Sequence, residues 1–460
     1  MQPKPLNRDA FELFQAHFDQ LLNPAHELVQ LARRVDWDRF EAGFASCYTQ
    51  DMGAPAKATR LMVGLQYLKY TFNESDESVV ARWVENPYWQ SFCGFTHLQH
   101  ECPIHPSSMS RWRKRVGVER LEALLHETIA LAQRDGHVSK ADLERVNVDT
   151  TVQEKNITYP TDSKLLYKAI QKLAGAAQSR GIALRQSYLR VGKIAAVKVG
   201  RYAHARQFRR MRRSLRKLRT YVGRLIRDIR RKVDAPDEEL ATLLQRVDRV
   251  RQQQPHDTHK LYSLHEPEVQ CISKGKAHKR YEFGQKVAIA TTNRGNWIVV
   301  AKLLPDNPYD GHTLADTLTA VQRVTGVTPS DAYVDKGYRG HGCATTVTVH
   351  VAGQRSESRA ERKRRRRRSA IEPKIGHLKS DHRMDRCFLT GLAGDAINAV
   401  LAAAGSNLRK LLRRLAAALI SWLWIAAVRT PWPRINARAA RIMLEPTPAA
   451  GPRPRLRLCA

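Results

Sequence analysis

The stretch RVNVDTT, residues 145–151, is where the hydrophobic pattern of this 460-residue chain changes its period. Upstream, ATRLMVGLQYLKYTF (58–72) and ESVVARWVENPYWQSF (77–92) carry apolar residues at the spacing of amphipathic helices. Within RVNVDTT, apolar and polar residues alternate instead, which is typical of a β-strand. The stretch therefore separates an all-α N-terminal part from a part that contains a sheet.

Four further segments predict strands, because they are short, rich in β-branched residues and bounded by turn residues. A helix over 310–326, closed by Gly326, precedes the last two of them, and a second helix begins within RKRRRRRSAIEPKIGHLK (362–379). Strands and helices in this order predict an α/β domain with a mixed five-stranded sheet. The four segments are 281–292, 296–305, 331–338 and 345–353.

A long basic segment interrupts the α/β domain between its first two strands. Residues 164–251 contain 25 Lys and Arg but only 6 Asp and Glu. Apolar residues follow an a/d heptad seam along a first helix (208–229), and a second helix starts near Pro236. We interpret the segment as an antiparallel helical hairpin, inserted at about 164–255.

The outer face of the first helix in this hairpin is basic. Two interpretations remain open, a dimerisation arm and a DNA-binding arm. Charge of nearly one sign would repel itself between two copies, which favours DNA binding. The candidate DNA contacts are Arg209, Arg210, Arg212, Arg213, Arg216 and Lys217.

A second candidate DNA contact lies in HPSSMSRWRKRVGVERLEALLHETIALAQ (105–133). Pro106 breaks the chain, and Ser107 or Ser108 can cap the helix that follows. A capped helix with basic first turns, preceded by two other helices, suits a helical DNA-binding module, and an ordinary surface helix fits equally well. The basic residues are Arg111, Arg113, Lys114 and Arg115.

The whole chain is strongly basic. Its formal net charge is +34 and its pI is about 10.3. An excess of this size indicates a polyanionic partner, most often nucleic acid. A ribosome-associated protein, or the arginine bias of a GC-rich genome, would give a similar composition. We expect double-stranded DNA as the partner.

Cysteine usage and hydropathy indicate where the chain works. Seven scattered cysteines without a CxxC pair argue for a reducing compartment. The N-terminus has no apolar signal-peptide core. The apolar run LAAALISWLWIAAV (415–428) has 14 residues, fewer than the ~18 that a membrane span needs. We expect a bacterial cytoplasmic, nucleoid-associated protein in which this run forms a buried or oligomer-forming helix.

Three acids stand out in so basic a chain. Asp149 and Asp335 each follow an apolar run, and we place both at the C-terminal end of a strand, where open α/β sheets bind ligands. Glu372 follows Asp335 after 36 intervening residues, on a helix that could cover the same sheet. Three such carboxylates can hold two Mg²⁺ or Mn²⁺ ions for phosphodiester chemistry. Taken singly, each acid could equally cap a turn.

Other potential sites carry weaker signals. A Cys and His cluster vaguely suggests zinc but lacks paired CxxC or HxxxH spacing, so we predict no zinc site there. His341 could act as a general base, although two-metal chemistry needs none. Lys274 and Lys276 are expected to contact DNA backbone or solvent. The Cys and His cluster consists of Cys93, His97, His100, Cys102 and His105.

Asp149, Asp335 and Glu372 resemble the DDE triad of bacterial insertion-sequence transposases, specifically the insertion-sequence-five family, InsH type. That family carries an Arg, three residues, a Glu, six residues and a Lys, which Arg368, Glu372 and Lys379 reproduce. A Tyr usually stands three places before the Arg, where this chain has Arg365. Three further blocks also resemble the family, and the similarity spans about residues 40–415. The blocks are 148–162, 263–287 and 334–340.

The resemblance implies a ribonuclease H-like catalytic domain whose triad binds two Mg²⁺ ions. Arg368 and Lys379 would then bind phosphates or the transposon end. The chain would cleave DNA at terminal inverted repeats and join the freed 3′ ends to a target, as a homodimer or larger assembly. Two alternatives stay open, an endonuclease without strand transfer and a catalytically inactive DNA-binding relic.

These observations predict four regions. Residues 1–140 form a helical DNA-binding or dimerisation domain, and 141–390 form the catalytic domain with its basic insertion. Residues 391–430 form C-terminal helices. The Pro-, Ala- and Arg-rich segment 431–460 is expected to be a disordered tail.

Overall fold

The computed structural model describes residues 16–49, 55–254, 256–273, 280–343, 346–353 and 358–429, with side chains up to residue 417. The chain divides into two compact units, Met1–Arg413 and Arg414–Ala460, and the first contains the sheet. Lys274, Lys276 and the predicted tail lie outside the described residues.

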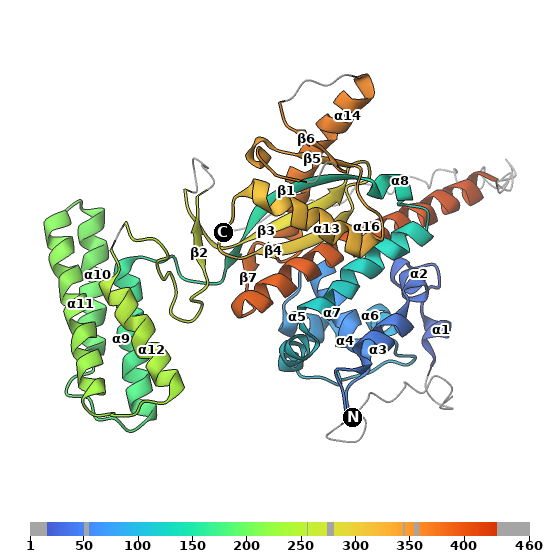
Figure 1. Ribbon diagram of the computed structural model, residues 1–460. Coiled ribbons are helices and arrows are strands. Elements are labelled where there is room, and N and C mark those ends of the chain that lie inside the picture. The colour runs from blue at the N-terminus through green and yellow to red at the C-terminus, as the bar shows by residue number, and fades with distance from the viewer. Residues whose placement is uncertain are drawn as a thin grey trace, which may run out of the picture. The chain divides into compact units, whose positions relative to one another are not determined.

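The N-terminal region is helical, as its 3.6-residue periodicity predicts (Figure 1). The segments 58–72 and 77–92 form α4, α5 and α6, with a break at Asn86, whose side chain caps α6. The helices of this region are α1 (Phe18–Leu21), α2 (Glu27–Arg34), α3 (Trp37–Ala45), α4 (Thr59–Thr71), α5 (Asp76–Glu85), α6 (Pro87–Phe92), α7 (Pro106–Arg134) and α8 (Lys140–Leu143).

Helix α7 carries the basic turns that the sequence singled out. Its N-cap is His105, which accepts a hydrogen bond from the amide of Ser107, so neither Ser107 nor Ser108 is the cap. Pro106 occupies the first helical position, where its missing N–H leaves no hydrogen bond unmade. Gly117 has a φ of 78°, a left-handed conformation that interrupts α7 after the basic turns.

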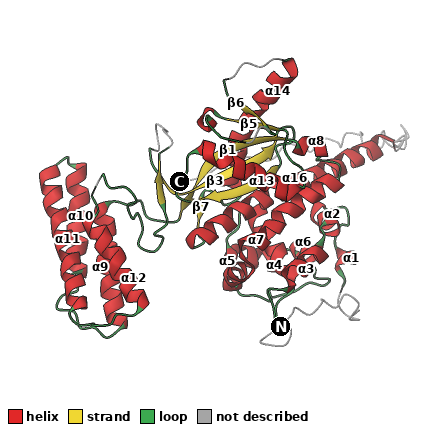
Figure 2. Cartoon of the chain, in the orientation of Figure 1, coloured by secondary structure: helices red, strands yellow, loops and turns green. Residues whose placement is uncertain are grey.

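The C-terminal region contains one mixed sheet (Figure 2). Its strand order is β2-β3-β1-β5-β6, with β4 also paired to β3 and β7 also paired to β1. Strand β1 pairs antiparallel with β3 and parallel with β5. The strands are β1 (Arg145–Lys155), β2 (Gln270–Ile272), β3 (Glu282–Thr292), β4 (Ile298–Leu304), β5 (Asp331–Val334), β6 (Thr348–Val351) and β7 (Arg386–Cys387).

An α/β fold with a mixed sheet is therefore confirmed, but the predicted number of strands was wrong. The described residues form seven strands, because β2 and β7 join the five that were expected. These two have three and two residues, which is too short to show an alternating pattern. Strand β5 is also shorter than predicted and ends at Val334, so that Asp335 follows the strand.

The basic insertion contains four described helices rather than two. The expected hairpin is present as α11 and α12, and α9 and α10 pack beside it, as Figure 1 shows. Seam residues Leu218, Val222, Leu225 and Ile229 are buried in the core of the bundle, whereas Phe208 at the start of α11 is exposed. The helices are α9 (Asp162–Ser179), α10 (Leu189–His204), α11 (Phe208–Arg230) and α12 (Glu238–Gln252).

The remaining helices pack on the sheet or lead to it. Helix α13 packs on β4 and β3, α15 packs on β1, and α7 of the N-terminal region also contacts β4. In α16, Asn407 accepts from the amide of Ile298 at 3.0 Å and donates to its carbonyl at 2.8 Å. These helices are α13 (Leu314–Thr325), α14 (Arg359–Arg367), α15 (Ile371–Asp381) and α16 (Gly391–Arg429). Among the described helices, none combines the length and apolar character that crossing a bilayer requires.

Candidate active site

The register of the sheet brings Asp149 and Asp335 side by side. Strand β1 pairs in parallel with β5 from Arg145 opposite Asp331 to Asn147 opposite Tyr333. If this offset is continued two residues beyond the last pair, Asp149 falls opposite Asp335, which follows the end of β5. In adjacent parallel strands, paired positions present their side chains on the same face. The two acids therefore start from neighbouring positions at the end of this parallel pairing.

The expectation that Asp149 ends its strand was wrong. Strand β1 continues to Lys155, because it goes on pairing with β3 after β5 has ended. Asp149 is thus mid-strand, opposite Ile289, but lies at the place where its parallel neighbour stops. Its carboxylate accepts a hydrogen bond from the amide of Thr150 at 2.7 Å.

A further acid, Asp310, was not predicted from the sequence and lies beside Asp335. A Cβ built on Gly337 would stand 3.1 Å from Asp335 Oδ1 and 3.4 Å from Asp310 Oδ2, so both carboxylates face the gap that this glycine leaves. The other oxygen of Asp310 accepts from Thr150 Oγ1 at 3.0 Å and from Lys286 Nζ at 3.1 Å. Asp310 begins a short 3-10 helix, η1 (Asp310–Thr313), and the sequence indicated only that it starts the helix predicted over 310–326.

The pKa of the fully buried Tyr338 reflects the negative charge of the nearby acids. It ends the 3-10 helix η2 (Lys336–Tyr338), whose N-cap is Asp335. Burial raises the pKa of Tyr338, and the negative charges of Asp149, Asp310 and Asp335 raise it further. Three carboxylates thus act electrostatically on one buried hydroxyl, which is consistent with a local concentration of negative charge in a basic chain.

Glu372 lies in the first turn of α15, and its side chain is 61% exposed. It accepts a hydrogen bond from Arg368 at 3.2 Å, and the same guanidinium stands 3.9 Å from Asp149. Arg368 therefore links the helix acid to the strand acid. The positive charge between the two carboxylates offsets their mutual repulsion.

Three asparagines attach the Glu372 segment to the sheet. Asn147 and Asn293 are buried, and their side chains hydrogen bond to each other at 2.7 Å. With Asn296 they donate to backbone carbonyls that recur every third residue along α14 and the 3-10 turn η3 (Arg368–Ala370). The pairs are Asn293 to Arg364 at 3.0 Å, Asn147 to Arg367 at 3.4 Å and Asn296 to Ala370 at 2.9 Å.

The donor set at this site fits a hard divalent cation. Asp149, Asp310 and Asp335 offer carboxylate oxygens, the ligands that Mg²⁺ and Mn²⁺ prefer. Asp335 and Asp310 converge on the space beside Gly337, as described above. In the part of the chain that the structure describes, however, no three His, Cys, Asp or Glu side chains are already arranged as a metal site.

Lys379 and Arg365, the other residues of the predicted signature, have different surroundings. Lys379 is partly buried, and its ammonium stands 3.9 Å from Glu282 at the start of β3. Arg365, which occupies the position of the usual Tyr, pairs with Glu361 one helical turn earlier. Both side chains thus make protein contacts as well as lying near Glu372 in sequence.

The basic side chains in the first turns of α7 differ in their exposure to solvent. Arg111, Lys114 and Arg115 are exposed, as a DNA contact requires. Arg113 is 2% exposed and binds Asp76 through two hydrogen bonds of 3.0 and 2.5 Å. The expectation that Arg113 contacts DNA is therefore corrected, because its guanidinium is committed to a buried ion pair.

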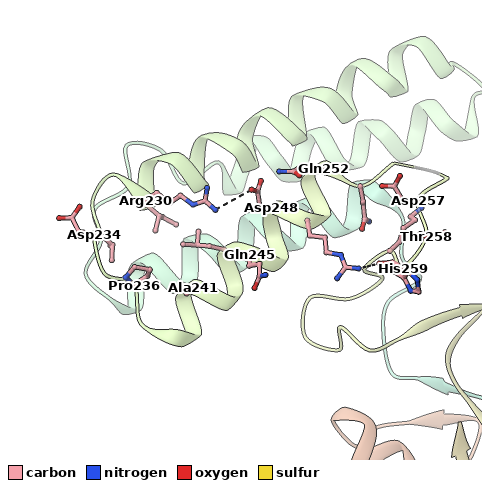
Figure 3. A pocket seen from close by; sticks show the side chains of 16 residues that line it. Arg230, Asp234, Pro236, Ala241, Gln245, Asp248, Gln252, Asp257, Thr258 and His259 are labelled. Atoms are coloured by element: carbon pink, nitrogen blue, oxygen red, sulfur yellow. Dashed lines mark hydrogen bonds and ion pairs between the residues drawn. The ribbon is translucent and has the colours of Figure 1, made fainter. Parts of the chain in front are cut away.

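The basic face of α11 is exposed along its whole predicted length. All six candidates, Arg209, Arg210, Arg212, Arg213, Arg216 and Lys217, are exposed to solvent. The insertion also holds a groove of about 980 Å³, lined by the end of α11, by α12 and by residues 257–260 (Figure 3). Asp248 in this groove is already paired, at 3.9 Å from Arg230 and 2.9 Å from Arg251. Asp248 is therefore not available as an unpaired catalytic acid.

The Cys and His cluster of the N-terminal region forms no zinc site among the described residues. Cys93 is fully buried, and burial raises the pKa of its thiol, which disfavours the thiolate that zinc binds. His105 serves instead as the cap of α7. His341 accepts a hydrogen bond from the amide of Cys343 in its own turn.

Comparison with known proteins identifies two transposase domains in this chain. A family model described as Transposase domain (DUF772) matches residues 16–115, and one described as Transposase DDE domain matches residues 248–408. The uncharacterized protein ORF8 in the nfe locus of Rhizobium meliloti is 52% identical over 208 residues, which is 45% of this chain and all of that protein. No solved structure matches. Asp335 and Glu372 lie within the second matched range, whereas Asp149 precedes it.

Proposed function

Since this chain belongs to the DDE transposases of insertion sequences, we propose that Asp149, Asp335 and Glu372 are the triad with which it cuts and joins DNA. The observation that supports the proposal is the register of β1 and β5, which would bring Asp149 and Asp335 to neighbouring positions if continued by two residues, together with the contacts of Arg368 with Asp149 and Glu372. The sheet and its helices fit a ribonuclease H-like catalytic domain.

The site would work with two Mg²⁺ or Mn²⁺ ions held by the triad, and Asp310 supplies a further carboxylate beside Asp335. When bound, such a pair of ions activates the attacking oxygen and stabilises the leaving oxygen of an in-line phosphodiester displacement. No protein nucleophile is required. The exposed Glu372 side chain can turn toward the strand acids once a phosphate replaces it as the partner of Arg368.

The chain's own cations would hold the DNA. Arg368, which lies between Asp149 and Glu372, and Lys379, seven residues after Glu372, would contact the phosphates of the transposon end. The exposed face of α11 and the exposed basic turns of α7 would grip the double helix elsewhere. Because both ends of an element must be joined in one reaction, we propose that the working form on DNA is a homodimer or a larger assembly.

The decisive experiment measures cleavage and joining on duplexes that carry the terminal repeats of the element bordering this gene, with Mg²⁺. Wild type is compared with Glu372→Gln, which keeps the size of the side chain and removes its charge. We expect wild type to join pre-cleaved 3′ ends to a target plasmid and the variant to lose at least ~100-fold in rate. Equal joining by both proteins would refute the triad.

The two alternatives give different outcomes in the same assay. An endonuclease would nick the terminal duplexes but leave pre-cleaved ends unjoined. An inactive relic would bind the duplexes and cut none of them. In that last case, Asp149→Ala and Asp335→Ala would change affinity at most.

A further inference from the structure

A charged cluster on the edge of the sheet lies outside the proposed triad. We call it the His350 clip, and it consists of His350 on β6, Asp331 on β5, and Glu361 and Arg365 on α14. His350 Nε2 stands 2.8 Å from Asp331, and Nδ1 stands 3.3 Å from Glu361. The imidazole is 12% exposed and thus contacts acids of both the sheet and the helix.

The neighbours of the ring fix its position. Its plane stacks on Tyr333 of β5, with ring centroids 4.6 Å apart and 11° between the planes. Arg365 donates to Glu361 at 2.8 Å and lies 3.3 Å from His350 Nδ1, and Arg145 of β1 stands 3.8 Å from Asp331. Although burial opposes it, the hydrogen bond with His350 holds the pKa of Asp331 below its usual value.

The clip is close in sequence to the residues that complete the proposed site. Arg365 lies three positions before Arg368 and seven before Glu372, and α14, η3 and α15 follow one another without a break. The asparagine contacts hold this segment at the carbonyls of Arg364, Arg367 and Ala370. The clip adds side-chain contacts between α14 and the sheet to these backbone contacts.

We propose that His350 is a positioning residue, which fixes α14 to the edge of the sheet and thereby sets Arg368 and Glu372 relative to Asp149. The role in catalysis rests on the proposed function, whereas the docking of α14 does not. Arg365 takes part in the clip at the position where a Tyr is usual, which gives this departure from the signature a structural role.

The first test measures amide hydrogen exchange of residues 359–371 in the full-length protein without DNA. We expect His350→Ala to raise exchange in this segment about tenfold, and His350→Gln, which keeps one donor, to raise it less. His100→Ala, at an exposed histidine of the N-terminal region, is the matched control. Unchanged exchange in His350→Ala would overturn the proposal.

The second test measures joining at saturating DNA. We expect His350→Ala to lower the maximal rate about tenfold with little change in affinity for the ends, because a misplaced helix acid affects chemistry more than binding. The double variant His350→Ala, Glu361→Gln should lose no more than the first change alone.

The outcomes separate the two claims. Loss of protection without any joining by wild type would keep the clip and reject the proposed function. Normal joining and protection in His350→Ala, beside an inactive Glu372→Gln, would reject the clip and keep the proposed function. Additive losses in the double variant would also count against a single clip.

Discussion

At the scale of single residues, burial decides what a charge can do. Arg111, Arg113, Lys114 and Arg115 look alike in sequence, yet Arg113 lies on the face of α7 that also buries Met109, Trp112 and Val116. Its guanidinium meets Asp76, which also binds Lys69 at 2.8 Å. A basic residue on the inner face of a helix therefore stabilises the fold instead of meeting DNA.

This ion pair predicts an acid-sensitive contribution to stability. Burial alone would raise the pKa of Asp76, but Arg113 and Lys69 lower it to about 2, below its usual 3.8. A carboxylate whose pKa is lower in the folded than in the unfolded protein stabilises the folded state at pH values above its unfolded pKa. This contribution disappears as the pH falls from about 3.8 through about 2. Compared with Asp76→Asn, wild type should lose its advantage in urea midpoint across that window.

Removing the partner of Asp76 should be costly at neutral pH. Arg113→Ala leaves a buried carboxylate without its bidentate partner, and we expect a loss of about 3–5 kcal/mol in the free energy of unfolding. Lys114→Ala is the matched control, because Lys114 is exposed beside it and should change stability by less than ~0.5 kcal/mol. Equal effects of both changes would contradict the structural role of Arg113.

At the scale of secondary structure, the local hydrophobic pattern predicted most of the strands but not the side-chain contacts between distant segments. Strands β1, β3 and β4 have the predicted locations, because alternation and turn residues are local signals. Asp310 escaped notice because its partners, Thr150 and Lys286, come from distant strands. A contact of that kind depends on register, which no local window contains.

The asparagine contacts show the same limit. Asn293 falls between the predicted strands 281–292 and 296–305, and its buried amide joins Asn147 and the carbonyl of Arg364, 71 residues away in sequence. Glu372 was correctly expected on a helix over the sheet. The sequence could not reveal that side-chain amides from one strand and from the turn between β3 and β4 hold the segment before that helix by its backbone.

These contacts predict how strongly the Glu372 segment is attached. Asn293→Ala would leave the Asn147 side-chain oxygen and the Arg364 carbonyl unsatisfied, and we expect a loss of about 2–3 kcal/mol in the free energy of unfolding. Asn156→Ala, at an exposed asparagine just after β1, should be nearly neutral. Chemical denaturation of both variants tests this, and similar midpoints would show that the amide contributes nothing.

At the scale of the whole molecule, the charge is unevenly distributed. The net charge of +34 includes 25 cations against 6 acids in residues 164–251. The insertion's apolar seam is buried within its own bundle, so the bundle needs no second copy to cover that seam. The six cations on the outside of α11 are exposed together, which favours a polyanion over a like-charged copy as their partner.

That distribution predicts a specific change in the salt dependence of DNA binding. Each phosphate neutralised by a cation contributes about −0.9 to the slope of log K against log salt concentration. If each of the six α11 side chains meets one phosphate, changing all six to Gln should reduce the steepness of the slope by about 5. Fluorescence anisotropy of a labelled terminal duplex, titrated from low to moderate KCl, measures this directly.

The matched control changes the five arginines among the six to lysine. It keeps every charge but removes the planar guanidinium, so the slope should stay near that of wild type if the contacts are electrostatic. A dimerisation arm gives the opposite pattern: the Gln variant would keep the wild-type slope, while its sedimentation coefficient without DNA would change. Since the apolar seam of α11 is unaltered in both variants, a loss of helicity in either would not be expected and is checked by circular dichroism.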